Sequence, residues 1–443
     1  MGNEQQKLLK MLLINTFALS IRHYMQNKFG IFLALKSYFV PSSDSITTTA
    51  KLSISDGAFW AIYSSMTSTF LVPLIIFMLG KNAPIGYIIG LPVLLVPLAQ
   101  FLSQKISRRV SNLKKTTIMI TILDRALWIP IIFLLFVHGY VLRLVLFIVL
   151  LSLRTFFASF SGTTWTLWIP TVIPEKDRAT YFSKRNFVMM LFSLVGYIFA
   201  LGIFLRIPVE MISFISVFLI GTVVFSSLSL FVMSKIPDFG LEEKERVSRS
   251  SVSSIFVWFL LFIALWSFGF SMVMPYFQLY VISPAFLNLD TAFYTIIFIA
   301  VSVTAISFQL IWGRISRIYG NRNTIIMSGM ILIVSASTIF LIHSPILIFI
   351  PAILYGAGQS GATLSIFNEM LGRSSASRIK SISYYNLISA LAAAAGPSVA
   401  NLIFDLSVFH IRNIFITAVF FISLSIVLLY ASGMGTTRTP SAV

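Results

Sequence analysis

The sequence predicts an all-α polytopic membrane protein with twelve transmembrane helices in two pseudo-symmetric bundles of six. Three observations support this fold class: the composition is apolar, apolar stretches recur at membrane length, and the second half repeats motifs of the first. Of the 443 residues, 57% are hydrophobic and only 10% are charged, whereas soluble domains carry about 25% charged residues. Most of the chain is therefore expected to lie in lipid.

A helix crosses a membrane in about 20 apolar residues, and twelve stretches of this kind are present. Those of the first half are 57–79, 84–104, 116–138, 144–168, 187–205 and 211–233. Those of the second half are 254–275, 292–312, 324–343, 345–368, 384–404 and 412–431. A polar stretch separates the two sets and is expected to link two bundles. We therefore predict five parts of the chain: an N-terminal extension 1–55, a bundle 56–234, a cytoplasmic linker 235–253, a bundle 254–432 and a tail 433–443.

The two halves share residues at matching spacing. Arg178, Asn186 and Gly196 recur as Arg378, Asn386 and Gly396. A duplicated membrane chain can rock one half against the other around a central site, which is the architecture of a secondary transporter. We therefore expect alternating access of a small organic solute, with the chain acting as a monomer.

The basic residues indicate the orientation. Lys and Arg outnumber Asp and Glu by 32 to 14, and most of them fall in one set of alternating loops. The opposite loops hold only Lys81, Arg143, Arg206 and Arg412. The positive-inside rule places the basic loops and both termini in the cytoplasm, so we predict a multi-pass protein of the cell membrane. The excess charge then contacts the lipid surface, and no basic soluble module for nucleic acid is present.

The N-terminal extension is apolar from Leu8 to Val40 but carries basic residues at intervals, among them Lys10, Arg22 and Lys28. This pattern favours an amphipathic helix lying in the membrane interface over one that crosses it. An extension without fixed structure is the alternative.

The stretch from Trp312 to Arg322 resembles the signature loop of the major facilitator superfamily, in which a Gly is followed by Asp-Arg-x-Gly and basic residues. Gly313, Gly320 and Arg322 match this loop, while Arg317 stands where the family has its aspartate. The resemblance implies the major facilitator fold and a gating role for these four residues at the cytoplasmic face.

Two further stretches resemble uncharacterised prokaryotic permeases of the same superfamily. The loop with Arg178 and Arg185 is similar to their connection between the fourth and fifth spans, and implies further gating residues. The stretch from Trp266 to Tyr276 is similar to their seventh span, and both side chains are candidates for the wall of a solute site. The resemblance indicates no particular substrate.

Small residues mark candidate gate helices. The eleventh span has four alanines followed by Gly396 and Pro397, and the fifth span has Gly196 and Gly202 in the matching region. Small residues allow close helix contact, and Gly-Pro produces a bend. Ordinary tight packing is the alternative interpretation.

Three ionisable residues are predicted near the middle of the membrane. Arg154 lies 11 residues after Arg143, and Asp124 and Arg125 lie 9 and 10 residues after Lys115, so all three reach a similar depth of about 15 Å. Such residues are functional candidates by default. Two arginines and one aspartate favour a carboxylate or phosphate group on the solute. The alternative is a structural Asp124–Arg154 pair, with Arg125 bound to a backbone carbonyl elsewhere.

Ion coupling needs a carboxylate whose charge changes during the cycle. Asp56 and Glu369 are expected at the cytoplasmic ends of spans, and Glu210, Asp290 and Asp405 at the outer ends. Asp124 is then the deep candidate for protons or another coupling ion. A neighbouring arginine makes a carboxylate a poor proton carrier near neutral pH.

The residue inventory argues against catalysis. Cysteine is absent, and no His pair, paired carboxylates or nucleotide-binding loop is evident, so we expect no catalytic residue, metal site or cofactor. A non-transporting sensor or scaffold derived from a transporter remains the main alternative. A membrane-embedded enzyme acting on lipid is the less favoured one.

Overall fold

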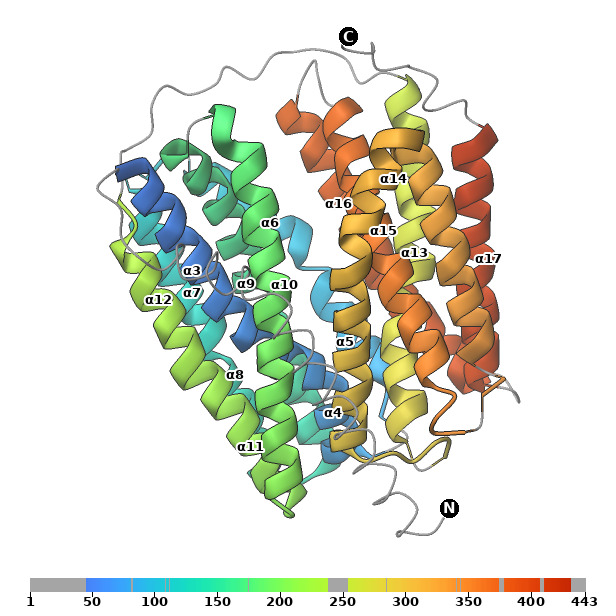
Figure 1. The fold of residues 1–443 in the computed structure, drawn as a ribbon. Helices are drawn as coiled ribbons and strands as arrows, with labels where there is room; N and C mark the ends of the chain where they lie inside the picture. The colour runs from blue at the N-terminus through green and yellow to red at the C-terminus, as the bar shows by residue number, and fades with distance from the viewer. Residues whose placement is uncertain are drawn as a thin grey trace, which may run out of the picture.

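The computed structural model describes residues 45–80, 83–107, 109–110, 112–173, 175–237, 254–283, 285–339, 341–342, 344–373, 378–406 and 410–431. The predicted interfacial helix Leu8–Val40, residues 238–253 of the linker and the C-terminal tail lie outside these ranges. The described chain is helical and forms two bundles that stand side by side (Figure 1).

The N-terminal bundle contains six spans, several of them broken into shorter helices. Its elements are α3 (Ser45–Thr67), η1 (Ser68–Phe70), α4 (Leu71–Leu79), α5 (Ile85–Val93), α6 (Val96–Ser107), α7 (Leu113–Ala126), α8 (Trp128–Phe133), η2 (Leu134–Phe136), α9 (Tyr140–Val172), α10 (Glu175–Arg206), α11 (Glu210–Leu219), η3 (Ile220–Phe225) and α12 (Ser226–Lys235). Prolines explain two of the breaks. Pro73 and Pro130 have no N–H to donate to the carbonyls four residues earlier, and the first and third spans are interrupted just before them.

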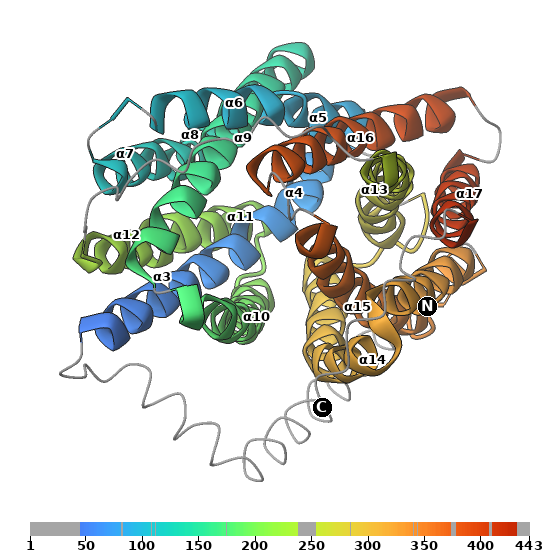
Figure 2. The same cartoon turned by 90° about the horizontal axis from the view of Figure 1, so that it is seen from above.

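The C-terminal bundle is built from longer, more continuous helices. They are α13 (Ser254–Ile282), α14 (Thr291–Ile339), α15 (Phe349–Arg373), α16 (Arg378–Leu406) and α17 (His410–Ala431). Seen from above, α5, α6 and α16 lie along one side of the molecule, and α10 faces α14 and α15 on the other side (Figure 2).

The number of spans agrees with the sequence. By length and apolar composition, ten helices of the described chain can cross a membrane. One of them, α14, has 49 residues and consists of two helices that meet at Gly320, where φ is 82°. α15 has 25 residues and is about 37 Å long, which is also enough to span. Dividing α14 and adding α15 gives the twelve predicted spans.

The first span begins earlier than expected. Its helix starts at Ser45, whereas the sequence suggested a span from 57 preceded by an extension. Residues 45–55 therefore belong to the first helix of the N-terminal bundle. Asp56 consequently lies inside the span Thr48–Leu79, about 12 Å from its beginning, and not at the end of the span.

The internal repeat is visible in the packing of two glycines. Gly196 on α10 packs so closely on α3 that an added Cβ would lie 2.0 Å from Ser65 Oγ. Its counterpart Gly396 on α16 packs on α13, with Ser271 Oγ at 2.1 Å from such a Cβ. Both serines donate to the carbonyl three residues before them, at 2.9 Å and 3.0 Å. The repeat therefore preserves a tight helix crossing within each bundle.

The two bundles contact each other at the end away from the basic loops, which is the lower end in Figure 1. Gly86 N on α5 donates to Asn401 Oδ1 on α16 at 3.2 Å. Thr291 Oγ1 on α14 donates to Glu210 Oε1 on α11 at 2.9 Å. These bonds join the bundles near this end.

Candidate functional site

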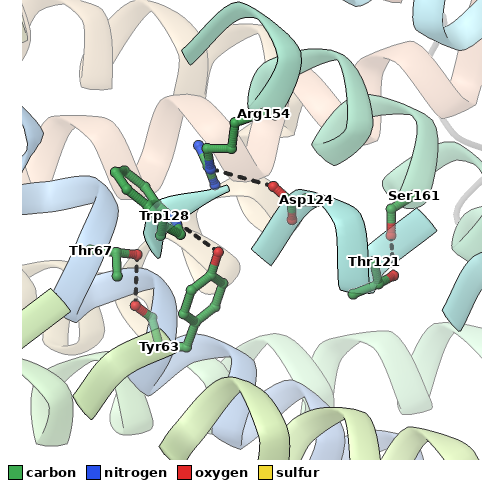
Figure 3. A network of polar contacts seen from close by, with 7 residues as sticks. All are labelled: Tyr63, Thr67, Thr121, Asp124, Trp128, Arg154 and Ser161. Carbon is green, nitrogen blue, oxygen red and sulfur yellow. Dashed lines mark hydrogen bonds and ion pairs between the residues drawn. The ribbon is translucent and has the colours of Figure 1, made fainter. Parts of the chain in front are cut away.

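The buried charges of the N-terminal bundle form the candidate site. Arg154 lies near the middle of the 33-residue α9, and its Nε is 3.4 Å from Oδ1 of Asp124 on α7 (Figure 3). The two side chains are 17% and 8% exposed, respectively. Neither atom makes a hydrogen bond to another described residue, so the contact is an ion pair without the geometry of a strong hydrogen bond.

Aromatic side chains hold the arginine in place. The Arg154 guanidinium carbon lies 4.5 Å from the centre of the Trp128 ring, a distance at which cation and ring attract each other. Trp128 Nε1 in turn donates to the Tyr63 hydroxyl on α3 at 2.8 Å (Figure 3). Trp128 and Tyr63 are fully buried, so three helices fix the position of the guanidinium.

Arg125 makes its hydrogen bond to another helix. Its Nη1 donates to the carbonyl of Ser226 on α12 at 2.9 Å, and its guanidinium carbon lies 5.4 Å from the centre of the Tyr63 ring. These contacts are the ones that the sequence analysis gave for a structural role of the three residues: Asp124 pairs with Arg154, and Arg125 binds a backbone carbonyl.

A second buried carboxylate was missed in the sequence. Asp56 is 3% exposed and accepts a hydrogen bond from Ser229 Oγ on α12 at 2.5 Å. Arg125 and Arg185 both interact with it electrostatically. Asp124 is therefore one of two buried carboxylates among the residues that the structure describes. The sequence analysis missed Asp56 because it started the first span too late. The helix begins at Ser45, which places Asp56 in the interior of the span and not at its end.

Arg185 links α10 to the same region. Its Nε lies 3.4 Å from the carbonyl of Ser53 on α3, and its guanidinium carbon lies 4.2 Å from the centre of the Trp165 ring. This predicted gating residue is buried between α3, α9 and α10. The side chain of Arg178, the other gating candidate of that loop, lies outside the described residues.

The comparisons with known proteins agree with this architecture. The sequence model of the Major Facilitator Superfamily matches residues 267–442. This match covers 176 of the 443 residues, so the second half of the chain is similar to the major facilitator superfamily. Proteins of that superfamily are membrane transporters and not enzymes, in agreement with the class of function predicted from the sequence. No curated protein matches the sequence significantly.

Solved structures of the superfamily share the fold across nearly their whole length. A bacterial homologue of the human lysosomal transporter Spinster, inward-facing and unoccupied, is 14% identical with a TM-score of 0.63, covering 88% of this chain and 98% of its own. An inward-facing bacterial homologue of the iron transporter ferroportin is 14% identical with a TM-score of 0.66, covering 87% and 98%. The nucleoside transporter NupG is 12% identical with a TM-score of 0.61, covering 87% and 98%.

The two aromatic candidates of the seventh span lie apart from the charged site. Trp266 packs inside the C-terminal bundle: its ring stacks on Phe270 at 6.3 Å and would lie 3.1 Å from a Cβ on Gly329 of α14. Tyr276 is buried where the bundles meet, with its hydroxyl 3.5 Å from Asn401 Oδ1 and close to Gly86. The structure therefore does not bring either one to Arg154.

The superfamily loop is a bend and not a separate turn. α14 continues from the eighth span into the ninth, and Gly320 alone departs from helical geometry. Gly313 lies within the helix, with open space where a Cβ would project. Arg322 donates from Nη2 to the carbonyl of Tyr430 on α17 at 2.6 Å, while Arg317 is exposed.

The candidate gate helix α16 makes contacts in both directions. Gly396 packs on α13 within its own bundle, and the carbonyl of Pro397 would lie 2.0 Å from a Cβ added to Gly86 on α5. Ser398 and Ala394 approach Gly90 of α5 in the same way. α16, together with Tyr276 of α13, therefore forms the contact between the C-terminal bundle and α5.

Proposed function

We propose that the protein is a secondary active transporter that moves a small organic anion, or an amphipathic compound with an anionic group, by alternating access. The observation that carries this proposal is the Asp124–Arg154 pair, a 3.4 Å contact in which neither facing atom is hydrogen-bonded to a described residue. A carboxylate or phosphate on the solute can form the bidentate hydrogen bonds with the guanidinium that Asp124 does not form. Asp124 then serves as the resting partner that the solute replaces.

The charge balance of the region supports an anionic solute. Three buried or half-buried arginines, Arg125, Arg154 and Arg185, surround two buried aspartates, Asp56 and Asp124. One positive charge is left over, and charge in the membrane interior is costly unless it is paired. An anionic group that binds Arg154 supplies the missing negative charge.

Ion coupling follows from the same exchange. Once the solute pairs with Arg154, Asp124 loses its closest partner while remaining 8% exposed. A carboxylate in such a place is stabilised by taking up a proton. We therefore propose Asp124 as the coupling group, with a proton as the coupling ion.

The contacts between the bundles support alternating access. They join α5 to α16 and α11 to α14 at the end away from the basic loops. Since the positive-inside rule assigns the basic loops to the cytoplasm, this arrangement is consistent with a state closed to the outside. Transport then requires these contacts to break while the opposite ends approach each other.

A ligand screen tests the proposal. Small carboxylates and phosphate esters are screened for an increase in the unfolding temperature of the purified protein, in parallel on wild type, Arg154→Gln and Arg206→Gln. Arg206 is exposed at the end of α10, so its variant removes the same charge away from the site. Compounds that bind as proposed stabilise wild type and Arg206→Gln but not Arg154→Gln. Equal stabilisation of Arg154→Gln would place the anion site elsewhere.

An uptake assay then distinguishes a transporter from a non-transporting sensor. Compounds found in the screen are followed into liposomes containing the wild-type protein, with and without an imposed pH gradient. The proposal predicts uptake that the gradient accelerates. Binding without uptake would instead support the non-transporting sensor, and uptake that ignores the gradient would exclude the proton as coupling ion.

A further inference from the structure

The N-terminus of helix α5 is capped by a side chain of the other bundle. α5 begins at Ile85, directly after Pro84, and the first N–H groups of a helix have no acceptor within that helix. The residue before a helix often satisfies one of them with a side-chain oxygen, but proline has no such atom. Here Gly86 N donates to Oδ1 of Asn401 on α16 at 3.2 Å. Asn401 therefore caps a helix to which it does not belong.

This cap can form only while the two bundles are in contact. α5 and α16 lie side by side in the view from above (Figure 2), and Asn401 is only 2% exposed between them. A Cβ on Gly86 would lie 2.0 Å from the Pro397 carbonyl and 2.7 Å from the Asn401 Cβ, so glycine is what permits this approach. When α5 and α16 separate, water replaces Asn401 at the Gly86 N–H, and the cap is lost.

The bond depends on which way the Asn401 amide points. Two donors converge on its oxygen: Gly86 N and, at 3.5 Å, the Tyr276 hydroxyl. The other end of the amide is an NH₂ group, which only donates. An amide turned by 180° would bring this group to the Gly86 N–H, and the bond between the bundles would be lost.

Asp405 is placed to prevent that rotation. It lies one turn further along α16, and its Oδ2 accepts a hydrogen bond from Asn401 Nδ2 at 2.9 Å. An ionised carboxylate has no proton to donate, so it binds the NH₂ end of the amide and not the oxygen. The oxygen is then directed to α5.

We propose that Asn401 is the latch that closes the outer end between α5 and α16, and that Asp405 is the positioning residue that keeps the Asn401 amide in the latching orientation. The inference rests on the alternating access proposed above, because it names a contact that must break when the outer end opens. It depends neither on the solute nor on the coupling ion.

The test measures the distance between the bundles in the full chain, in lipid nanodiscs and without solute. Spin labels are attached at Val141→Cys and Ile416→Cys, which are 70% and 47% exposed and lie in the first two turns of α9 and α17. The native chain has no cysteine. Asn401→Leu removes the acceptor, so the ratio of open to closed molecules should rise about fivefold, as expected for one hydrogen bond.

Asp405 is tested through its effect on the amide. Asp405→Leu keeps Asn401 but lets its amide rotate, so the ratio should rise to a value between those of wild type and Asn401→Leu. Asn401→Asp keeps an acceptor but places it beside the Asp405 carboxylate, so repulsion between like charges should open the outer end.

Exchanging the two residues gives the decisive variant. In N401D/D405N the carboxylate at position 401 accepts from Gly86 N, and the amide at position 405 donates to that carboxylate. The distances should return to those of wild type. A role in packing alone predicts no such rescue.

A cap within one bundle provides the matched control. Asn112 caps α7, and its Oδ1 accepts from Lys115 N at 2.7 Å. Asn112→Leu removes a cap of the same kind and should leave the distances unchanged. The proposal is overturned if Asn401→Leu leaves the distances unchanged, if the exchange variant is as open as Asn401→Asp, or if Asn112→Leu opens the outer end equally. Because no solute is present, these results stand even if the anion screen finds no ligand.

Discussion

The Tyr294 hydroxyl donates a hydrogen bond of 2.7 Å to the carbonyl of Thr69, and this bond joins the two bundles. The acceptor is available because of Pro73. In a regular helix the N–H of residue 73 would bond to the carbonyl of residue 69, but proline has no N–H. The first span accordingly breaks into a 3-10 turn at Ser68–Phe70. A break in one bundle thus provides the docking point for a tyrosine of the other.

Removing this bond should loosen the contact between the bundles. Tyr294→Phe keeps the ring, which packs on Phe70 and Phe298 at 5.9 Å and 4.7 Å, and deletes only the hydroxyl. One hydrogen bond contributes about 1 kcal/mol, so the ratio of open to closed molecules at this end should rise about fivefold. Spin labels on Leu205→Cys and Ile346→Cys, both exposed at this end, report the distance between bundles. The native chain has no cysteine to interfere.

Tyr280→Phe is the matched control for this measurement. Its hydroxyl donates to the Ile342 carbonyl at 2.6 Å, but both residues belong to the C-terminal bundle. The variant should therefore lose stability without changing the distance distribution. If both variants shift the distances equally, the Tyr294–Thr69 bond has no special role in closure.

Breaking the Asp124–Arg154 pair on one side should cost more than removing both partners. Arg154→Gln leaves Asp124 buried without its closest partner, so Asp124 must either stay charged, at a cost of about 3 kcal/mol on insertion scales, or take up a proton. The double variant Asp124→Asn/Arg154→Gln removes both charges, so its unfolding temperature should recover toward that of wild type. Thermal unfolding of Arg154→Gln, of Asp124→Asn and of the double variant gives the coupling free energy between the two charges. Additive losses in the double variant would show that the two charges do not interact.

Hydropathy and spacing predicted most of the architecture because they depend on local composition. The twelfth span was expected at 412–431 and forms α17, His410–Ala431. The depth of Asp124 and Arg154 followed from residue counts along two opposed helices, which also made their pairing foreseeable. The matching glycines Gly196 and Gly396 identified equivalent helix crossings, because only a residue without a side chain permits such a close approach.

Other features depend on which face of a helix meets which neighbour, and the sequence does not contain that information in readable form. α13 is apolar on all sides, so periodicity could not tell whether Trp266 faces the other bundle or packs against Gly329. The start of the first helix was hidden by the Ser/Thr-rich stretch 42–49, a composition typical of loops. That error also concealed the burial of Asp56.

The Asp56–Ser229 hydrogen bond should contribute measurably to stability. Ser229→Ala leaves the buried carboxylate without its only hydrogen-bond donor among the described residues, which costs about 1–3 kcal/mol. Ser234→Ala is the control on the same helix, because Ser234 is exposed and donates only to the carbonyl of Phe231. Unfolding temperatures should fall for Ser229→Ala and stay near wild type for Ser234→Ala. Equal temperatures for both variants would mean that Asp56 has found another donor.

The two repeat-related glycines offer a test of the packing in each bundle. A Cβ on Gly196 would lie 2.0 Å from Ser65 Oγ and 2.9 Å from the Ile62 carbonyl, and one on Gly396 would lie 2.1 Å from Ser271 Oγ and 2.4 Å from the Phe268 carbonyl. Real Cβ atoms do not approach this closely, so the helices must separate.

Gly196→Ala and Gly396→Ala should each destabilise the protein by about 1–3 kcal/mol, the usual cost of overpacking. Gly202→Ala is the control on α10, since nothing lies within 4 Å of its Cβ position. Alanine favours a helix over glycine by up to about 1 kcal/mol, so this variant should be neutral or more stable. Thermal unfolding of the three variants tests whether the two helix crossings are equivalent. If Gly196→Ala is destabilised while Gly396→Ala is as stable as wild type, the repeat has preserved the glycine in the sequence but not the close helix crossing.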